Sequence, residues 1–292
     1  MSSPSPSAAI HHVSDTAVWV AHYRVLESQR ADALFRDPLA KVLTGERGRK
    51  IAEHLEQFQS QTMTQWSVVI RTVVIDELIQ KLVSEGVDMV VNLGAGLDTR
   101  PYRLTLPESL QWVEVDYPDF IAHKESLLAG ERPNVRLERA GLDLADDGAR
   151  RSLLARLGAR AKCALILTEG VVPYLTEEQV AALSDDLHAQ PVFRYWIAEY
   201  FAPETYRWFK AKKRRDHFKN APFQFFPADW LGLFRAHGWT AKETRYLAEE
   251  GQRLGRPIRL PWWVRLLLKL GGQKRAKRGA RFVGYILFQR NG

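Results

Sequence analysis

The chain has 292 residues, of which 46% are aliphatic or aromatic, and this is enough for one large α/β domain with a substantial core. Its net charge is +8, and no apolar run reaches the ~18 residues of a membrane span. We therefore expect a cytoplasmic protein. The only cysteine, Cys163, excludes an internal disulfide and a cysteine-based metal centre. Because Cys163 begins an apolar strand, we expect a buried, inert thiol.

The N-terminal part is predicted to be helical. Residues 1–13 begin with a Ser- and Pro-rich stretch and are predicted to be a disordered tail, ahead of a single domain over 14–292. Within 14–85, a helix is expected over 16–29, and Asp37-Pro38 then breaks the helical pattern. Since this segment precedes the first strand, it can fold over the sheet edge as a lid. A second helix is expected over 66–82, where Arg71 and Asp76 interrupt the apolar pattern. Such charges are more often structural ion-pair members than ligands.

The stretch around which the chain is organised begins as an apolar strand from residue 89 and breaks at Gly94-Ala95-Gly96. This is how a buried parallel strand runs into a nucleotide-binding turn in a Rossmann-like sheet. Gly94 would allow the tight turn, and Gly96 would let the backbone approach a ligand closely. Thr99 stands where the dinucleotide fingerprint requires its third glycine, which disfavours a dinucleotide.

Short apolar strands and helices then alternate as far as residue 201. The strands are expected over 112–116, 135–143, 164–169 and 195–201, and helices over 119–129 and 147–157. This alternation predicts right-handed crossovers and a parallel sheet, whose ligands bind beyond the carboxyl ends of the strands. Gly94, Asp116, Asp143 and Glu169 all fall at such ends. Glu114 and Asp116 both follow the glycines at about the distance expected for an acid that binds ribose hydroxyls, and Asp116 is the one at the strand end.

The C-terminal part carries two predicted insertions, over 203–230 and 250–280. The first is rich in aromatic residues, which suit either a pocket for an apolar acceptor or ordinary core packing. The second contains a Trp- and Leu-rich stretch over 260–270, for which a second lid or an oligomer contact is favoured over a membrane-surface helix. Antiparallel strands are expected over 240–246 and 282–289. Basic runs at 210–215 and 269–281 come without a nucleic-acid-binding motif, so we expect no nucleic-acid partner and no membrane contact.

Three sequence blocks, at residues 92–100, 113–118 and 169–175, resemble the leucine carboxyl methyltransferase family. The chain looks most like the bacterial branch that includes polyketide O-methyltransferases of the tetracenomycin type. The segments at 21–24 and 37–40 also resemble this branch. The resemblance implies a class I methyltransferase that uses S-adenosylmethionine. It further implies a seven-stranded, mostly parallel sheet with an antiparallel last strand.

The resemblance also implies roles for individual residues. Arg71 occupies the place of an arginine that meets the methionine carboxylate of the cofactor. Asp143 would accept a hydrogen bond from the adenine amine, and Leu144 would pack on the adenine ring. Glu169 would bind the methionine amino group. The full predicted cofactor-binding set lies at the strand ends and on the preceding helix: Arg71, Gly94, Ala95, Gly96, Asp116, Tyr117, Asp143, Leu144, Glu169 and Gly170.

The expected reaction is O-methylation of a carboxylate or phenol on a small-molecule or peptide natural product, in secondary metabolism. A carboxylate is ionised at neutral pH and needs no base, whereas a phenol benefits from one. Arg24, Arg71 and Arg100 are compatible with an anionic acceptor, which favours the carboxylate. No catalytic residue can be named, because none of the candidate bases lies in an identifying motif: His22, His54, His188, His217 and His237.

Other functions and properties stay open at this point. No cluster has metal-ligand spacing, so we expect no metal and full activity in EDTA. The alternatives to a methyltransferase are a nicotinamide-dependent reductase, and a protein that binds S-adenosylmethionine without turnover. The acceptor and the oligomeric state are not predicted by the sequence.

Overall fold

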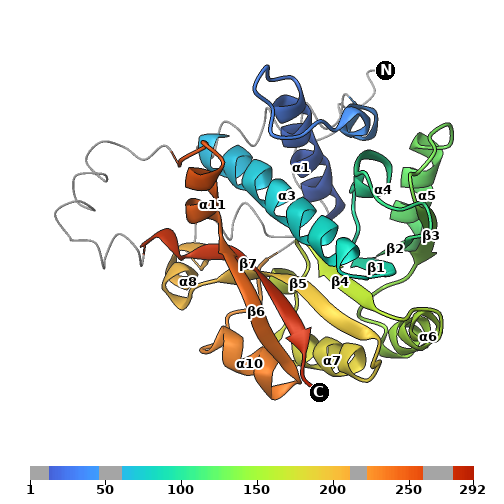
Figure 1. Cartoon of the computed structure of the whole chain (residues 1–292). Coiled ribbons are helices and arrows are strands. Elements are labelled where there is room, and N and C mark those ends of the chain that lie inside the picture. The colour runs from blue at the N-terminus through green and yellow to red at the C-terminus, as the bar shows by residue number, and fades with distance from the viewer. Residues whose placement is uncertain (1–12, 46–60, 211–221, 259–278) are drawn as a thin grey trace, which may run out of the picture.

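A seven-stranded sheet forms the centre of the protein, as described by a computed structural model over residues 13–45, 61–210, 222–258 and 279–292 (Figure 1). The strand order is β3-β2-β1-β4-β5-β7-β6. Strands β1 to β5 pair in parallel, and β7 is antiparallel to both of its neighbours. The strands are β1 (Met89–Leu93), β2 (Gln111–Asp116), β3 (Arg136–Gly141), β4 (Ala164–Thr168), β5 (Phe193–Phe201), β6 (Trp239–Tyr246) and β7 (Val283–Arg290). The predicted sheet with its antiparallel last strand is confirmed.

Helices cover both faces of this sheet (Figure 1). One face packs against α3 (Gln61–Ser84) and α11 (Leu247–Arg253), and the other against α6 (Asp147–Gly158), α7 (Glu177–His188) and α10 (Trp230–Ala236). The N-terminal helix α1 (Val13–Ser28) packs on α3. The other labelled elements are short: α4 (Arg100–Arg103), α5 (Pro118–Leu127), η1 (Val172–Tyr174), η2 (Pro203–Thr205) and α8 (Tyr206–Phe209). Residues 38–45 are helical as well.

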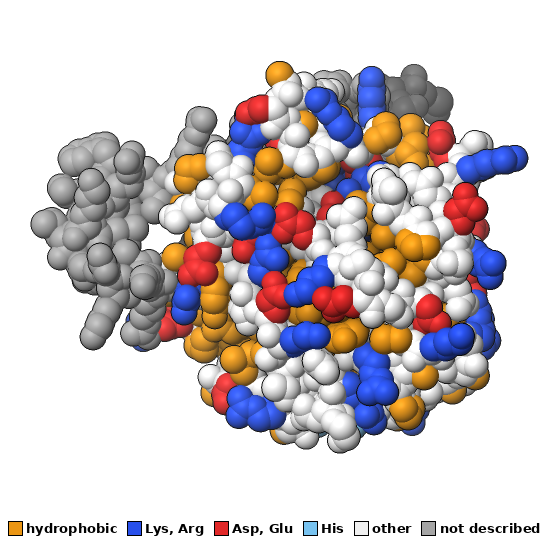
Figure 2. All heavy atoms as spheres, in the orientation of Figure 1, with side chains coloured by type: hydrophobic (Ala, Val, Ile, Leu, Met, Phe, Trp, Pro, Cys, Tyr) orange, Lys and Arg blue, Asp and Glu red, His pale blue; other side chains and the backbone are white. Residues whose placement is uncertain are grey.

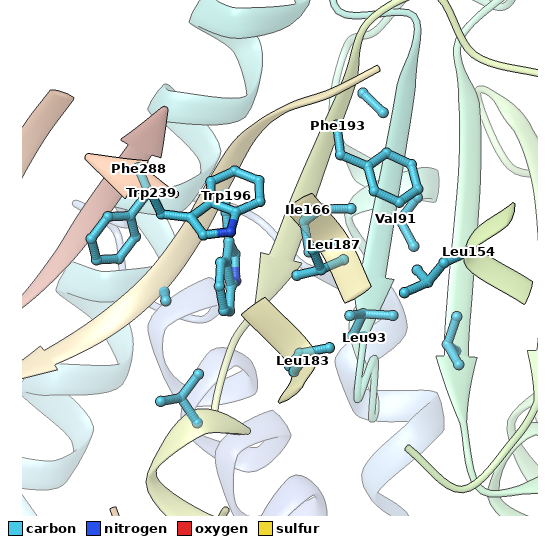
Figure 3. Packing of buried hydrophobic residues seen from close by; sticks show 14 of the residues in the cluster. Val91, Leu93, Leu154, Ile166, Leu183, Leu187, Phe193, Trp196, Trp239 and Phe288 are labelled. Atoms are coloured by element: carbon cyan, nitrogen blue, oxygen red, sulfur yellow. The ribbon is translucent and has the colours of Figure 1, made fainter. Parts of the chain in front are cut away.

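Alternation of side chains along the strands explains these two layers. Successive strand residues point to opposite faces, so Val90 contacts the α3 side while Val91 contacts the α7 side. Figure 3 shows the second layer, where Trp196, Trp239 and Phe288 lie together beside Leu183 and Leu187 of α7. Their rings are mutually tilted or edge-on, with the Trp196 and Trp239 centroids 5.5 Å apart. The central strands β1 and β4 are therefore buried on both faces, as their apolar sequences predict, whereas the edge strands β3 and β6 are mostly partly buried or exposed.

Some predicted boundaries differ from the structure. Strand β3 ends at Gly141, so Asp143 lies in the following turn and not within a strand. Helix α3 begins five residues earlier than expected, at Gln61. The predicted tail ends one residue too late, because Val13 already belongs to α1; the rest of that tail and the stretch 260–270 lie outside the described residues. Thr176 caps α7 with the reciprocal hydrogen bonds to Gln179 that a capping box requires.

The aromatic insertion divides between core and sheet edge. Phe225 is buried against Trp230, with ring centroids 4.6 Å apart, and belongs to the core. Phe223 instead meets Tyr174 edge-on at 5.0 Å, just beyond β4. The core-packing interpretation therefore holds for the first of these residues, while the second remains available for a pocket.

Charged side chains of both signs are interspersed on the face drawn in Figure 2. Several charges form ion pairs in the structure: Lys81 pairs with Glu243, and Arg245 pairs with Glu77 and Glu250. Such pairs cancel much of the local positive charge. In the described part of the chain, no helix is both long enough and apolar enough to cross a bilayer.

Candidate functional site

The turn after β1 is built on glycine conformations. Gly94 has φ +68° and Gly96 has φ +50°, a region that side chains rarely adopt. A Cβ on Gly94 would also lie 2.4 Å from the Val171 side chain. The amides of Gly94 and Ala95 both donate to the Val115 carbonyl, at 2.8 and 3.0 Å, which fixes the turn against β2. This close, side-chain-free approach of backbone suits a nucleoside-binding turn.

Asp116 ends β2 beside this turn. Its Oδ2 accepts a hydrogen bond from the Gly96 amide at 2.7 Å, and its Oδ1 accepts from the Tyr117 amide at 2.8 Å. The Tyr117 ring is 44% exposed, although it is a large side chain. Partial burial and the charges of Asp143 and Asp116 raise the pKa of the Tyr117 phenol. Asp116, Tyr117 and Asp143 therefore share one region at the carboxyl ends of β2 and β3.

Asp143 and Leu144 lie beyond β3 rather than at its last residue. The Asp143 carboxylate is exposed and accepts from the Ala145 amide at 2.9 Å, while the Leu144 side chain packs against the α7-side core. The Leu142 amide donates to the Asp116 carbonyl at 2.8 Å, the last hydrogen bond between β2 and the chain that leaves β3, and Asp143 follows it. Asp143 is thus held in a turn that faces the Tyr117 region.

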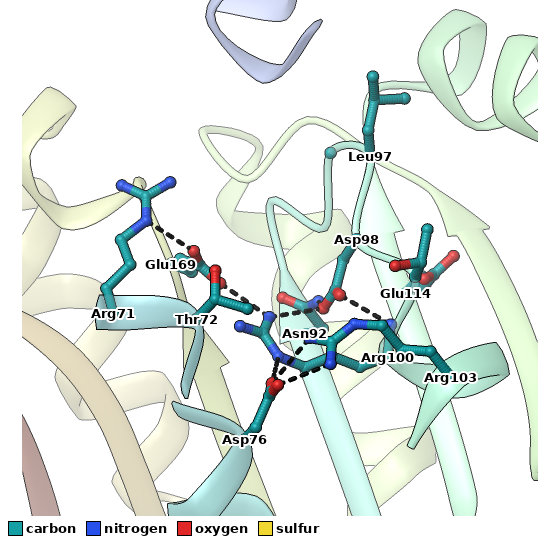
Figure 4. Close-up of polar contacts among 12 residues, drawn as sticks. Arg71, Thr72, Asp76, Asn92, Leu97, Asp98, Arg100, Arg103, Glu114 and Glu169 are labelled. Atoms are coloured by element: carbon teal, nitrogen blue, oxygen red, sulfur yellow. Dashed lines mark hydrogen bonds and ion pairs between the residues drawn. The ribbon is translucent and has the colours of Figure 1, made fainter. Parts of the chain in front are cut away.

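Arg71 and Glu169 face each other across the sheet edge (Figure 4). Arg71 Nε lies 2.9 Å from Glu169 Oε1, but its N–H does not point at that oxygen well enough to form a hydrogen bond. The two terminal nitrogens of Arg71 extend away from Glu169. Burial alone would raise the pKa of the Glu169 carboxyl, but the charges of Arg100 and Arg71 hold it below its usual range. The site therefore presents an ionised carboxylate next to a guanidinium whose terminal nitrogens point away from it.

Beneath this pair, Arg100 is the centre of a buried charge cluster (Figure 4). Its Nη1 donates to Glu169 Oε2 at 2.8 Å and to Asp98 Oδ2 at 2.9 Å, and its Nε donates to Asp76 Oδ1 at 2.6 Å. Arg103 donates both Nη groups to Asp76, at 2.6 and 2.8 Å. Burial would raise the pKa of Asp98, but Arg100 and nearby cations lower it to about 2. These contacts fix the position of Glu169 from below.

Arg100 and Arg24 are not free to bind an anionic acceptor. Arg100 is 2% exposed and already faces three carboxylates, while Arg24 donates to Asp37 Oδ2 at 2.9 Å and to the Leu97 carbonyl. The compatibility with an anionic acceptor that the sequence indicated therefore does not extend to these two arginines. Their guanidinium groups satisfy buried carboxylates that would otherwise carry a large desolvation cost.

The N-terminal segment folds over the glycine turn. The side chain of Ala17 in α1 lies 3.4 Å from the position of a Cβ on Gly96. Thr99 Oγ1 donates to Asp37 Oδ2 at 2.7 Å, so the turn after α1 is fastened to the end of the glycine loop. Thr16 in α1 forms a hydrogen bond with the hydroxyl of Tyr174. These contacts place the segment against the glycine turn, and its role as a lid stays a prediction.

Glu199 on β5 is a buried carboxyl that the sequence did not single out. It is 4% exposed, and its Oε1 accepts a hydrogen bond from the amide of Gly170, which has φ +74°. No hydrogen-bond partner for Oε2 occurs within the described residues. Burial raises the pKa of Glu199 to about 7. A single Glu inside the apolar strand sequence Trp-Ile-Ala-Glu-Tyr-Phe was the signal that could have revealed it.

The other candidate groups lie away from these residues or carry other contacts. His237 pairs with Asp185 of α7 at 2.7 Å, and His188 packs edge-on against Trp239 in the α7-side layer. His54 and His217 lie outside the described residues. Cys163 is only partly buried, contrary to expectation, and burial raises its pKa. Among the residues that the structure describes, no cluster of three or more His, Cys, Asp or Glu side chains could hold a metal ion.

Known proteins resemble this chain in sequence and in fold. A model of the leucine carboxyl methyltransferase family matches residues 17–188. A Streptomyces avermitilis protein named "Putative S-adenosyl-L-methionine-dependent methyltransferase" is 32% identical, over 84% of this chain and 89% of its own length. A similarly named Streptomyces coelicolor protein is also 32% identical, over 83% and 88%. In fold, the chain matches a "putative methyltransferase" from Thermobifida fusca with a TM-score of 0.58 and 14% identity, covering 96% and 95%.

The sheet order, the glycine turn and these relatives together define an S-adenosylmethionine-dependent methyltransferase. The chain belongs to the leucine carboxyl methyltransferase family. Its cofactor is accordingly S-adenosylmethionine, and the relatives give no support to the nicotinamide-dependent alternative.

Proposed function

We propose that the protein transfers the methyl group of S-adenosylmethionine to a carboxylate oxygen of an acceptor with an apolar body. The observation that carries this is the pairing of Tyr174 with Phe223 next to Arg71. The phenol of Tyr174 is half-buried, and burial raises its pKa to about 12, so it stays protonated and can donate a hydrogen bond at neutral pH. Phe223 lies against it, and Phe201 lies 6.0 Å from Phe223 between ring centroids. An aromatic wall with a hydroxyl donor suits an apolar acid.

The cofactor would lie along the carboxyl ends of β1, β2 and β4. Gly94, Ala95 and Gly96 would let the backbone approach it, and the Asp116 carboxylate would accept from the ribose hydroxyls. Asp143 would accept from the adenine amine, with Tyr117 and Leu144 beside the ring. This assignment is supported by the shared region that Asp116, Tyr117 and Asp143 occupy.

At the methionine end, Arg71 and Glu169 match a zwitterion. The two Nη atoms of Arg71 extend away from Glu169, so they would bind the carboxylate in a fork. Glu169 would accept from the ammonium group, and Gly170 would hold the turn that places it. Because Glu169 is kept ionised by Arg100 and Arg71, this half of the site is ready without reorganisation.

When bound, S-adenosylmethionine supplies a methyl group on a positively charged sulfur. Residues of the chain would hold the acceptor oxygen in line and exclude water, which supplies much of the catalysis for a good leaving group. Tyr174 would donate to one oxygen of the acceptor carboxylate and leave the other free to form the new C–O bond. The S–CH3 bond breaks with its electron pair going to sulfur, so the products are a methyl ester and neutral S-adenosylhomocysteine.

The experiment is a transfer assay with radiolabelled S-adenosylmethionine and matched acceptors, an aromatic acid and the phenol of the same ring. We expect label in the acid, released as methanol by mild alkali because esters hydrolyse. Alkali-stable label would indicate an ether or an amine product and contradict the proposal. Binding of S-adenosylmethionine without S-adenosylhomocysteine release from any acceptor would favour the non-catalytic alternative.

Tyr174→Phe provides the matched variant, because it keeps the ring that packs on Phe223 and removes only the hydroxyl. Loss of a hydrogen bond to a charged group costs ~1.5 to 3 kcal/mol, so we expect the KM for the acid to rise roughly tenfold or more. The affinity for S-adenosylmethionine should stay within about twofold of the wild-type value.

A further inference from the structure

Glu199 lies at the polar end of an otherwise apolar layer between the sheet and α3. Side-chain alternation along β5 places Ile197 on the α3 side, and Glu199 follows two residues later on the same side. Tyr285 of β7, also in that layer, is its register partner. Glu199 contacts the Gly170 amide, and Gly170 directly follows Glu169. The Glu199 carboxyl therefore contacts the residue that follows Glu169, and Glu169 lies at the proposed methionine end of the cofactor site.

The ionisable groups that act on Glu199 come from four elements. Arg71 on α3 favours its charged form, whereas Glu169 after β4 opposes it. Tyr174 of η1 and Tyr285 of β7 also interact with it, and burial raises the pKa of both phenols, so each stays neutral near pH 7. With Oε2 unpartnered among the described residues, the ionisation of Glu199 is set by its surroundings and not by a dedicated ion pair.

Without Glu199, the buried cluster is electrically balanced. The cations Arg71, Arg100 and Arg103 face the anions Glu169, Asp98 and Asp76. An ionised Glu199 adds one uncompensated negative charge to a dry region, where charge–charge interactions are stronger than in water. S-adenosylmethionine carries one positive charge more than S-adenosylhomocysteine, because its sulfur is a sulfonium. The substrate would therefore compensate that extra charge, and the product would not.

We infer that Glu199 discriminates the sulfonium cofactor from its neutral product: it is ionised in the complex with S-adenosylmethionine, whereas S-adenosylhomocysteine leaves its protonation as it is in the free protein. The inference rests on the cofactor placement proposed above. Binding of the sulfonium releases a proton from Glu199 to solvent, and conversion to the thioether removes the charge that favoured the ionised form. Product release is thereby favoured by the same group that favours substrate binding.

The sign of the pH dependence follows from Glu199 being half-ionised near pH 7 in the free protein. A sulfonium lowers its pKa, so affinity for S-adenosylmethionine rises as the pH rises through 7. S-adenosylhomocysteine has the same adenosine and carboxylate groups, so the ratio of the two dissociation constants removes their titrations. The sulfonium also lowers the pKa of the ligand's own amino group, so the part that comes from Glu199 is the difference between the wild type and Glu199→Gln. If the sulfonium lowers the pKa of Glu199 by about one unit, the preference for S-adenosylmethionine over S-adenosylhomocysteine should be roughly fivefold larger at about pH 8 than at about pH 6.

The test is calorimetric titration of both ligands into the full chain between about pH 6 and pH 8, with the wild type, Glu199→Gln and Glu204→Gln. Glutamine keeps the size of Glu199 and an acceptor for the Gly170 amide but cannot ionise. Glu204 lies three residues beyond β5 and is exposed, so Glu204→Gln removes the same formal charge elsewhere. We expect the ratio to change more with pH in the wild type and in Glu204→Gln than in Glu199→Gln, by the roughly fivefold factor that Glu199 contributes.

A ratio that is constant in the wild type, or that rises equally in Glu199→Gln, overturns the inference while leaving the cofactor placement intact. Failure of both ligands to bind the wild type overturns the placement and the inference together. Should Glu199→Gln not fold, titration of the wild type in two buffers of different ionisation enthalpy decides the matter. Near pH 7 we expect proton release with S-adenosylmethionine and none with S-adenosylhomocysteine, and equal release with both contradicts the inference.

Discussion

Thr99 donates its hydroxyl hydrogen to Asp37 Oδ2 across 2.7 Å, which joins the glycine loop to the turn after α1. The same Asp37 oxygen accepts from Arg24 of α1 at 2.9 Å, and Asp37 is 1% exposed. The threonine that replaces the third glycine of the dinucleotide fingerprint therefore has a structural role. Its hydrogen bond holds the N-terminal segment over the strand ends. In a dinucleotide-binding fold, a glycine at this position lets the helix pack close to the sheet.

We expect Thr99→Val to destabilise the fold, because the buried Asp37 carboxylate loses a hydrogen bond and gains no partner. The expected loss in the free energy of unfolding is ~1.5 to 3 kcal/mol, measured by urea denaturation. Thr99→Ser keeps the hydroxyl and serves as the control, with a clearly smaller loss. Thr99→Gly restores the dinucleotide pattern but should not produce NAD binding. Equal stability of the Val and Ser variants would show that the hydrogen bond contributes nothing.

The Asp98 carboxyl should make stability depend on acid pH. Its pKa is lowered to about 2 in the folded protein from an ordinary 3.8, so its contribution is complete above the ordinary value and disappears as pH falls from there towards 2. This shift corresponds to about 2 kcal/mol. In urea denaturation, the stability difference between the wild type and Asp98→Asn should shrink by roughly that amount as the solution is acidified from about pH 5. A difference independent of pH would contradict the assignment.

The parts of the fold that depend on local pattern could be predicted from the sequence. The apolar runs predicted β1 and β4, and the Thr176 capping box predicted the start of α7. The strand-end positions of Gly94, Asp116 and Glu169 follow from the same alternation.

The contacts that depend on tertiary pairing could not be predicted in this way. The sequence indicated Asp76 as a member of a structural ion pair but not its partner Arg100, because their pairing joins α4 to α3 across residues 24 positions apart. For the same reason Arg24 and Arg100 counted as compatible with an anionic acceptor, although buried carboxylates already occupy them. The burial of Glu199 likewise depends on α3 and β7, which lie far from it in the chain.

Asp116→Ala should weaken the binding of S-adenosylmethionine and of adenosine alike, because both carry the ribose hydroxyls. We expect a loss of ~1.5 to 3 kcal/mol in each binding free energy by calorimetry. Asp119→Ala is the control, since Asp119 is an exposed carboxylate at the start of α5 and its removal changes the net charge equally. Unchanged affinity in Asp116→Ala would remove this residue from the cofactor site.

The central claim is that the carboxyl edge of the sheet holds S-adenosylmethionine with its methionine end between Arg71 and Glu169. Arg71→Lys tests it, because lysine offers a point charge in place of the planar fork that binds a carboxylate by two parallel hydrogen bonds. Adenosine lacks the methionine carboxylate, so its affinity reports general damage to the site.

The decisive measurement is the ratio of the dissociation constants for S-adenosylmethionine and adenosine in the wild type and in Arg71→Lys, by calorimetry at one pH. We predict that the substitution weakens S-adenosylmethionine roughly tenfold or more, the range for a lost charged hydrogen bond, and leaves adenosine within about twofold. An equal weakening of both ligands, or of neither, would contradict the account and leave Arg71 as a structural partner of Glu169.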